Sequence, residues 1–297
     1  MKKIKNFIFR IYKKLNYKKI VKEHQKNKTE LCSHEIRLMQ FHKSLLDSER
    51  FKDDLKLNKF GYKNFSQFDE DGIINEIFKR IGTKTKCFLE IGVGDGLECN
   101  THSLIYNDWS GSWIDGSEHF CKQIRSKFKF ALDNNLNLSN SFVNKDNINE
   151  LANNLCPNGI DLLSIDIDGN DFYIWDSIVD LNPRVVIMEY NTKFPPPMDW
   201  VMEYNESHMQ DKTSYFGASL VALTNLGTKK QYSLVGCSLH GANAFFVRND
   251  LLDDKFQAPY TAENHYEPCR YGLAWKYRSG LRDGVGPFTS SLKMLNK

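Results

Sequence analysis

The sequence predicts an α/β fold: a doubly wound, seven-stranded, mostly parallel sheet with an antiparallel last strand, preceded by a helical extension. Three observations lead to this prediction. From Phe65 onward, short apolar runs alternate with helical stretches, which is typical of a parallel sheet covered by helices on both faces. A glycine-rich turn directly follows the first of these runs. Only a short loop separates the last two runs, which favours an antiparallel pair that closes the sheet.

The candidate strands are short apolar runs. Those at 161–166 and 184–189 end in carboxylates, and the run at 140–144 is the weakest of the set. We expect strands at 87–91, 111–115, 140–144, 161–166, 184–189, 232–235 and 244–247. The helical stretches between them lie near 71–81, 119–130, 171–181 and 218–226.

The net charge of +3 conceals an uneven distribution along the chain. Residues 1–28 contain eleven Lys and Arg against one acid, Glu23, a charge of about +10, which leaves about −7 for residues 29–297. A mildly acidic body argues against a nucleic-acid-binding domain, because the phosphates of such a partner require a basic surface.

Residues 1–58 are expected to form a basic helical extension, and residues 59–297 one domain with a C-terminal cap or tail from about residue 258. Lysines and apolar side chains lie on opposite faces of the first helix, the pattern of a helix that binds anionic lipid at a membrane surface. A solvated or oligomer-packing helix explains the pattern equally well. The apolar residues at helical spacing are Ile4, Phe7, Ile8, Ile11 and Leu15.

Cysteine usage and hydropathy indicate the cytoplasm. The seven cysteines are scattered and form no C-x-x-C pair, so neither a disulfide framework nor a zinc site is expected. No stretch approaches the ~20 apolar residues of a membrane-spanning helix. Arg10 interrupts the apolar run at 7–9, and no small-residue cleavage site follows, so no signal peptide is expected. The chain is therefore placed in the cytoplasm, with the inner face of the membrane as the site if residues 1–28 bind lipid.

The segment Glu90-Ile-Gly-Val-Gly-Asp-Gly96, after the first strand, is the most informative motif. Its glycines let the backbone approach a ligand closely. The motif is not a complete dinucleotide-binding fingerprint, because that fingerprint has a third glycine where this chain has Leu97. Asp115 ends the second strand, where an acid can accept both hydroxyls of a ribose. Asp146 and Asn147 follow the expected third strand, where they can read an adenine edge. Each acid alone could be structural, but their order predicts a nucleoside-type ligand.

On these residues the sequence resembles the class I S-adenosylmethionine-dependent methyltransferases, which have a Rossmann-like fold, over roughly residues 60–250. Within that superfamily it resembles an FkbM-like group associated with sugar and surface-glycan modification, through residues 66–72, 100–101 and 243–247. The segment 164–171 departs from that group, in which a Glu-Gly pair commonly follows the fourth strand. The resemblance implies S-adenosylmethionine as the cofactor, lined by Gln67, Glu90, Gly92, Gly94, Asp115, Gly116, Ser117, Asp146, Asn147 and Asp166.

A second group of polar residues follows the fourth and fifth strands. In a doubly wound sheet, ligands gather at the carboxyl ends of the strands, and carboxylate and amide oxygens suit Mg²⁺. One interpretation is a magnesium site that lowers the pKa of a chelated hydroxyl. In the other, the same acids bind cofactor, backbone or substrate without a metal. The candidate ligands are Asp166, Asp168, Glu189 and Asn191.

Asp166 and His240 are the candidate catalytic residues. His240 lies between the last two strands, and an imidazole with a pKa near ~6.5 suits proton removal, although a loop histidine is more often a packing residue. Methyl transfer needs mainly positioning and exclusion of water, so a base is not required. Residues 194–197, with Trp200, Tyr204 and His208, are expected either to cover the substrate or to form a rigid connection.

The sequence therefore predicts an S-adenosylmethionine-dependent O-methyltransferase acting on a sugar, surface-glycan or nucleotide-linked precursor. One alternative is a phosphorylated or phosphoramidate-type acceptor, for which the arginines of the tail argue (Arg270, Arg278 and Arg282). Another is a non-catalytic, membrane-associated binding protein on the same fold. The expected partners are a small-molecule or glycan substrate and, through residues 1–28, an anionic membrane surface, but no nucleic acid.

Overall fold

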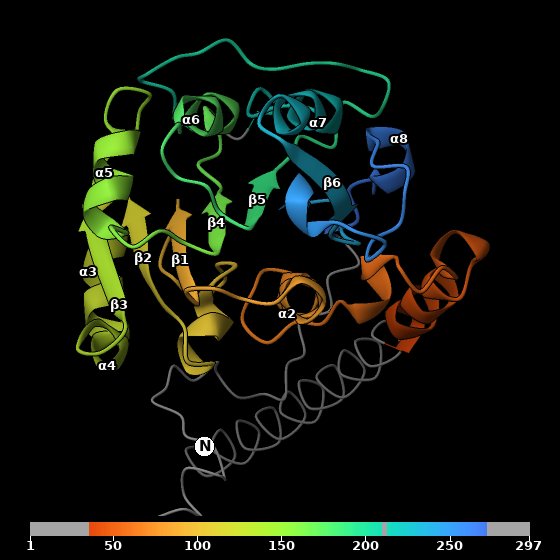
Figure 1. Cartoon of the computed structure of the whole chain (residues 1–297), viewed down its shortest axis with the longest axis horizontal. Helices are drawn as coiled ribbons and strands as arrows, with labels where there is room; N and C mark the ends of the chain where they lie inside the picture. The colour runs from red at the N-terminus through yellow and green to blue at the C-terminus, as the bar shows by residue number, and fades with distance from the viewer. Residues whose placement is uncertain (1–35, 210–212, 272–297) are drawn as a thin grey trace, which may run out of the picture.

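The structure is a computed structural model that describes residues 36–209 and 213–271. Its strands are β1 Cys87–Ile91, β2 Ser110–Asp115, β3 Leu136–Asn140, β4 Leu162–Ile165, β5 Val185–Glu189, β6 Tyr232–Cys237 and β7 Asn243–Arg248. They form one seven-stranded sheet in the order β3-β2-β1-β4-β5-β7-β6 (Figure 1). Neighbours from β3 to β5 are parallel, and β7 is antiparallel to both β5 and β6. The predicted fold class is confirmed.

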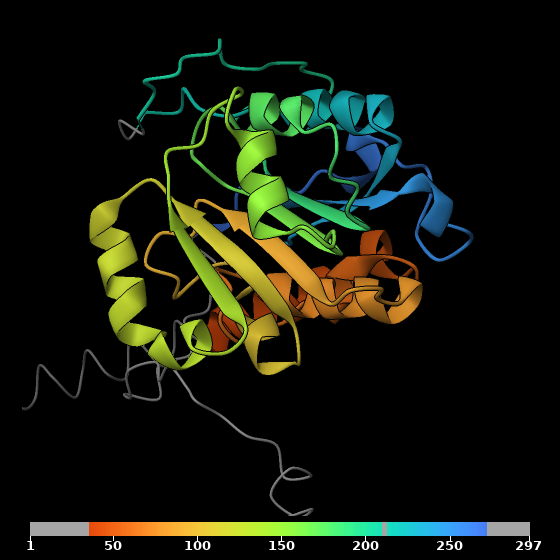
Figure 2. The same cartoon turned by 60° about the vertical axis from the view of Figure 1, so that its left-hand side comes forward.

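Helices cover both faces of this sheet, and each face has its own hydrophobic core, as expected when alternate side chains of buried strands point to opposite faces. Figure 1 shows α6 and α7 on one side and α2 on the other, and Figure 2 shows the strands between the two layers. One core involves α5 Ile148–Leu155, α6 Asp171–Ser177 and α7 Leu220–Lys229. The other involves α2 Glu70–Ile81, η3 His102–Tyr106, α3 Glu118–Lys127 and α4 Lys129–Leu132.

The third strand was predicted at 140–144, and this is wrong: β3 covers Leu136–Asn140. β3 is an edge strand that pairs with β2, so its polar residues can face water and it carries little apolar signal. The apolar pair Phe142 and Val143, which suggested the later position, lies in the loop after the strand. The polypeptide therefore leaves the sheet before Ser141, which changes the residues available at this end of the sheet.

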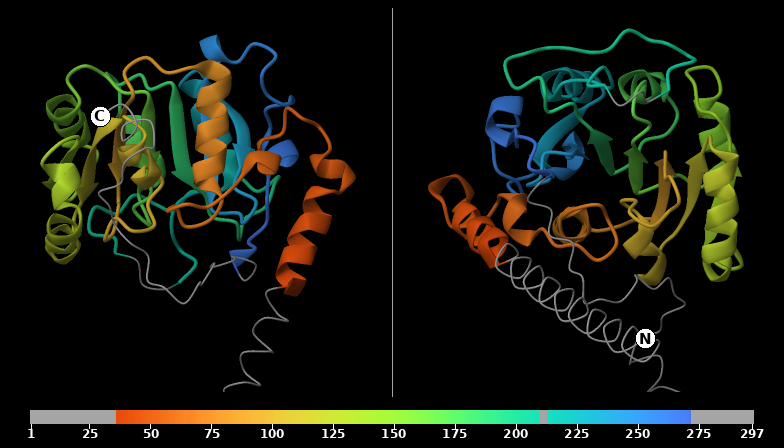
Figure 3. Two further views of the ribbon diagram at one scale, coloured as in Figure 1. Left: turned by 90° about the horizontal axis from the view of Figure 1, so that it is seen from below. Right: turned by 180° about the vertical axis from the view of Figure 1, so that it is seen from behind.

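The two ends of the described chain lie against each other (Figure 3). Residues 36–46 are helical, and η1 Glu49–Phe51 and η2 Leu57–Phe60 follow. The fully buried carboxylate of Glu267, after α8 Ala262–His265, accepts hydrogen bonds from Arg50 Nε at 3.2 Å and from Arg270 Nη1 at 2.7 Å. The basic segment 1–28 and the tail beyond Tyr271 lie outside the described residues. Across 36–209 and 213–271, no helix has the length and apolar character needed to cross a bilayer.

Replacing Glu267 with glutamine is expected to lower the free energy of unfolding by about 2 kcal/mol, because charge-assisted hydrogen bonds to two arginines are lost in a buried site. Urea unfolding followed by circular dichroism measures this change. Glu263→Gln is the matched control, since Glu263 is exposed on α8 of the same segment and its replacement should change the value by less than about 0.5 kcal/mol. Equal stability of the two variants would contradict the role given to Glu267.

Candidate functional site

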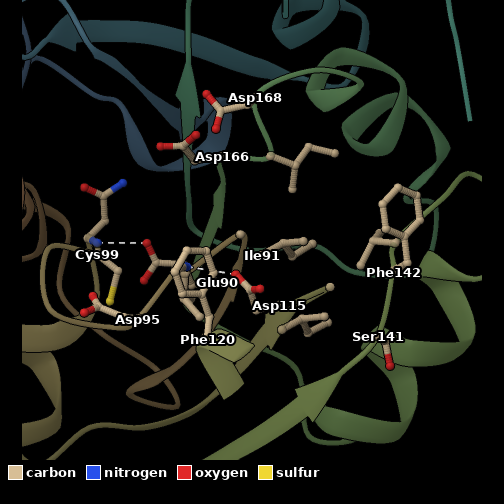
Figure 4. Close-up of a pocket in the computed structure, with 18 of the residues that line it drawn as sticks. Glu90, Ile91, Asp95, Cys99, Asp115, Phe120, Ser141, Phe142, Asp166 and Asp168 are labelled. Atoms are coloured by element: carbon tan, nitrogen blue, oxygen red, sulfur yellow. Dashed lines mark hydrogen bonds between the residues drawn. The ribbon is translucent and has the colours of Figure 1, made fainter. Parts of the chain in front are cut away.

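A cavity of about 570 Å³ opens at the carboxyl ends of the parallel strands (Figure 4). The loops after β1, β2, β3 and β4 line it, together with Asn243 at the start of β7. Of the cofactor residues expected from the sequence, those that line the cavity are Gln67, Glu90, Gly92, Gly94, Asp115, Gly116 and Asp166. Ser117, Asp146 and Asn147 are not part of the lining.

Two glycines in the turn after β1 have different tasks. Gly92 has φ +83°, and a Cβ there would lie 1.7 Å from the backbone oxygen of Asp166, so the turn packs directly on the segment after β4. Gly94 has φ +56°, and a Cβ there would meet no atom within 4 Å. Gly92 therefore permits close packing, whereas Gly94 borders open space in the cavity.

Glu90 has a structural task beneath this turn. Its Oε1 accepts hydrogen bonds from Asn100 N at 2.8 Å and Ser164 Oγ at 3.3 Å, and its Oε2 accepts from both the backbone N and the Oγ1 of Thr101. A carboxylate offers about four lone-pair sites, and the protein occupies all of them here. Burial raises the pKa of Glu90. Glu90, which the resemblance implies as a cofactor residue, therefore has no acceptor site left for a ligand: it holds the segment of Asn100 and Thr101.

Asp115, at the end of β2, keeps acceptor capacity for a ligand. Its Oδ2 accepts a hydrogen bond from Gly94 N at 2.8 Å and its Oδ1 from Ser117 N at 2.7 Å, so one lone pair remains on each oxygen. Burial raises the pKa of Asp115, while the two N–H donors oppose that shift. Two fixed, free lone pairs match two adjacent hydroxyls such as those of a ribose. Ser117 itself caps α3, since its Oγ accepts from Phe120 N.

The segment after β3 reaches the cavity with residues that precede, along the chain, those expected from the sequence. Because β3 ends at Asn140, the residues that reach the lining are Ser141, Phe142 and Val143. Asn147 instead shapes the loop: its side chain accepts from Asn144 N and donates to Phe142 O. Asp146 is exposed outside the cavity. Residues 141–143 therefore lie at the edge of the cavity where Asp146 and Asn147 were expected.

Two aromatic side chains that the sequence did not predict as site residues line the cavity, Phe120 and Phe142. Phe142 is half exposed, and its ring lies close to Gly116, where a Cβ would be 3.2 Å from Phe142 Cδ2. Phe120, on α3, also lines the cavity and is 39% exposed. Exposed phenylalanines beside a polar cavity suit a flat aromatic ligand. The signal in the sequence was an aromatic residue shortly after a strand end.

Three of the four expected metal ligands come together. Carboxylate oxygens of Asp166, Asp168 and Glu189 lie within 4.8 Å of one another, and Figure 4 shows Asp166 and Asp168 side by side. Burial, together with the charges of neighbouring carboxylates, raises the pKa of both Asp166 and Glu189 well above the usual values. These three acids are hereafter called the acid cluster, and their close approach favours a positively charged group between them.

The turn that carries Asp168 is fixed by Asp171, whose carboxylate accepts from the backbone N–H groups of Ile167 and Gly169, each at 2.8 Å. Asp168 has φ +53° within this turn and is exposed. Asn191, the fourth expected ligand, points elsewhere: its Nδ2 donates to the carbonyl groups of residues 214 and 216, and its Oδ1 accepts from Lys193 N. Asn191 therefore anchors a loop and is not available to the cluster.

His240 is not part of the cavity lining. It is 6% exposed, its ring stacks on Phe68 with 4.8 Å between centroids, and its Nδ1 lies 3.1 Å from Asp69 Oδ1. The cause is the motif at 66–72, whose acids bind the β6–β7 turn: Asp69 accepts from Leu239 N, and Glu70 accepts from Asn243 Nδ2. His240 is thus a buried packing residue, the second of the two roles considered from the sequence. Burial and the charge of Asp69 raise the pKa of Glu70 to about 7.

Of the expected covering segment, only His208 lines the cavity. Its Nε2 lies 3.2 Å from the backbone oxygen of Asp168. Phe194 and Trp200 stack on each other with 4.2 Å between ring centroids. The ring of Tyr204 lies beneath Lys145 Nζ at 3.9 Å. Most of this segment therefore packs on itself or on neighbouring loops.

No protein-family model and no curated protein matches the sequence. Among solved structures, the chain is similar to a putative caffeoyl-CoA O-methyltransferase from Staphylococcus aureus, with 12% identity over 72% of this chain and 99% of that one and a TM-score of 0.44. It is also similar to an S-adenosylmethionine-dependent methyltransferase from Clostridium acetobutylicum, with 12% identity, coverage of 70% and 98%, and a TM-score of 0.38. A third is the N-terminal domain of EvdMO1 with S-adenosylhomocysteine bound, with 11% identity, coverage of 65% and 90%, and a TM-score of 0.38. The fold class itself rests on the strand order given above.

Proposed function

We propose that the chain is an S-adenosylmethionine-dependent methyltransferase. The observation that carries the proposal is Asp115, buried at the end of β2 with one free lone pair on each oxygen, beside a glycine that opens onto a cavity of about 570 Å³. The strand order, with β7 inserted antiparallel between β5 and β6, agrees with the layout that the resemblance to class I methyltransferases implies.

The residues present fit this cofactor from end to end. Asp115 would hold the ribose hydroxyls, and Ser141 to Val143, with the Phe142 ring, would border the adenine. Gln67 and Asp166 line the same cavity and would lie at its methionine end. The bound cofactor supplies an electrophilic methyl carbon on a sulfonium. The chain binds and orients it, and the open space at Gly94 leaves room for the ligand against the backbone.

We further propose a hydroxyl acceptor on a sugar or surface-glycan precursor, as the FkbM-like resemblance implies. The acceptor would enter beside the acid cluster, where the carboxylate of Asp166, which lines the cavity, could take up the hydroxyl proton as the methyl group passes from sulfur to the acceptor oxygen and leaves S-adenosylhomocysteine. The three carboxylates also fit the oxygen ligands of a divalent cation such as Mg²⁺, but Asn191 does not contribute to that set. We also propose peripheral binding to an anionic membrane through residues 1–28, on the basis of their basic, amphipathic sequence.

Isothermal titration calorimetry with S-adenosylhomocysteine and S-adenosylmethionine tests the function. We expect saturable one-to-one binding with dissociation constants below about 100 µM. Absence of binding by either compound at millimolar concentration would exclude the proposed function, and with it the assignment of the cavity as a cofactor site.

A further inference from the structure

We propose that the methyl acceptor carries a protonated amino group, and that the acid cluster of Asp166, Asp168 and Glu189 binds it. An amino sugar is an acceptor of this class. The inference rests on the proposed function, because it concerns the acceptor end of the same cavity. It also argues against the phosphorylated acceptor that the arginines of the tail had suggested.

The charges in the cavity lining are the first argument. Among the described residues, the lining contains six carboxylates and neither lysine nor arginine; the acids are Glu90, Asp95, Glu98, Asp115, Asp166 and Asp168. The first four carboxylates already have partners within the protein. Glu90 and Asp115 accept hydrogen bonds from N–H and hydroxyl groups. Asp95 lies 2.8 Å from Lys127 Nζ, and Glu98 lies 3.3 Å from Lys63 Nζ.

Asp166 and Asp168 differ from these four. Within residues 36–209 and 213–271, neither they nor Glu189 form a salt bridge with lysine or arginine. Three carboxylates within 4.8 Å repel one another unless a proton or a cation lies between them. A phosphate would add to this repulsion, whereas an ammonium group would relieve it.

The neighbouring side chain on β7 points to the same ligand chemistry. Asn243 lies opposite Glu189 in the antiparallel pair of β5 and β7, lines the cavity and is 3% exposed. Its Nδ2 donates to Glu70 Oε1 at 3.0 Å, which fixes the orientation of the amide. Its Oδ1 has no hydrogen-bond partner among the described residues. A buried acceptor without a partner costs free energy, and a ligand N–H would satisfy it.

His208 also lines the cavity, and its Nε2 lies 3.2 Å from the backbone oxygen of Asp168. The acceptor end thus combines carboxylates with an amide oxygen that has no partner among the described residues. An ammonium group supplies three N–H donors and a positive charge, so it matches both the hydrogen-bonding and the charge of this end.

Sinefungin provides a test that needs no knowledge of the natural acceptor. It is an analogue of S-adenosylmethionine with an amino group at the position of the transferable methyl, so its ammonium should reach the acid cluster. Calorimetry at pH 7 with EDTA should show sinefungin binding at least about tenfold more tightly than S-adenosylhomocysteine. Asp168→Asn should reduce this ratio at least about threefold with little change for S-adenosylhomocysteine. Asparagine tolerates the left-handed backbone at 168, so the variant should fold.

Glu98→Gln is the matched control, because it also removes a carboxylate from the lining but one that already pairs with Lys63; the sinefungin ratio should not change. Equal binding of the two ligands to the wild type, or a ratio that Asp168→Asn leaves unchanged, would overturn the inference while the proposed function stands. Micromolar Mn²⁺ that abolishes the sinefungin preference would show that a divalent cation is the occupant, and would also overturn it. Failure of S-adenosylhomocysteine itself to bind would refute the proposed function first.

Discussion

Replacing Asp115 with alanine is expected to raise the dissociation constant for S-adenosylhomocysteine at least about tenfold. The substitution removes two charge-assisted hydrogen bonds to the ribose. It also frees the backbone N–H groups of Gly94 and Ser117, which Asp115 now holds at 2.8 and 2.7 Å, so the turn beneath the cofactor loses its support. Calorimetric titration of the purified variant measures the change.

Asp146→Ala is the informative control for this experiment. The sequence placed Asp146 at the adenine, whereas the structure places it exposed outside the cavity. Its replacement should leave the dissociation constant within about twofold, since surface substitutions have small effects. The expected order of effects is therefore a large one at 115 and none at 146. A large loss at 146, or none at 115, would contradict the assignment of the cavity.

Substituting Gly92 with alanine should be strongly destabilising. The new Cβ would lie 1.7 Å from the backbone oxygen of Asp166, and φ at this position is +83°. Strands β1 and β4 are neighbours in the sheet, so relief of this overlap would require them to separate. We expect a loss of at least about 3 kcal/mol in the free energy of unfolding, or failure to fold. Thermal and urea unfolding of the variant measure it.

Gly94→Ala separates stability from binding. This residue is also in the left-handed region, with φ +56°, but a Cβ there meets nothing within 4 Å. The variant should fold with a loss of about 1 to 2 kcal/mol. Its methyl group enters the open cavity, so S-adenosylhomocysteine should bind more weakly. An equal loss of stability in the two variants would show that backbone conformation, and not the approach of Gly92 to the segment after β4, limits substitution in this turn.

Much of the fold could be predicted because its central strands are buried on both faces and read as continuous apolar runs. The runs at 87–91 and 184–189 correspond to β1 and β5 nearly residue for residue. The edge strand β3 could not be located in this way, since no strand of the described residues lies on one of its sides and its sequence, Leu-Asn-Leu-Ser-Asn, is largely polar. The apolar Phe142 and Val143 just beyond it carried the stronger signal but lie in a loop.

The site residues also differ in whether the sequence alone could place them. Residues at the ends of central strands, such as Asp115 and Asp166, were predicted because topology alone brings the carboxyl ends of parallel strands together. Asn191 and His240 follow strand ends or turns at the same edge, but hydrogen bonds decide where their side chains point. Those bonds involve residues distant in sequence, such as Asp69 with His240. No spacing rule in a single sequence contains that information.

A crystal structure of the protein with S-adenosylhomocysteine would test the central claim most directly. We expect the ribose hydroxyls to lie within hydrogen-bond distance of both oxygens of Asp115, the adenine beside Ser141 to Val143, and the sulfur toward Asp166. A nucleoside bound outside this cavity, or one whose ribose does not contact Asp115, would contradict the proposed function.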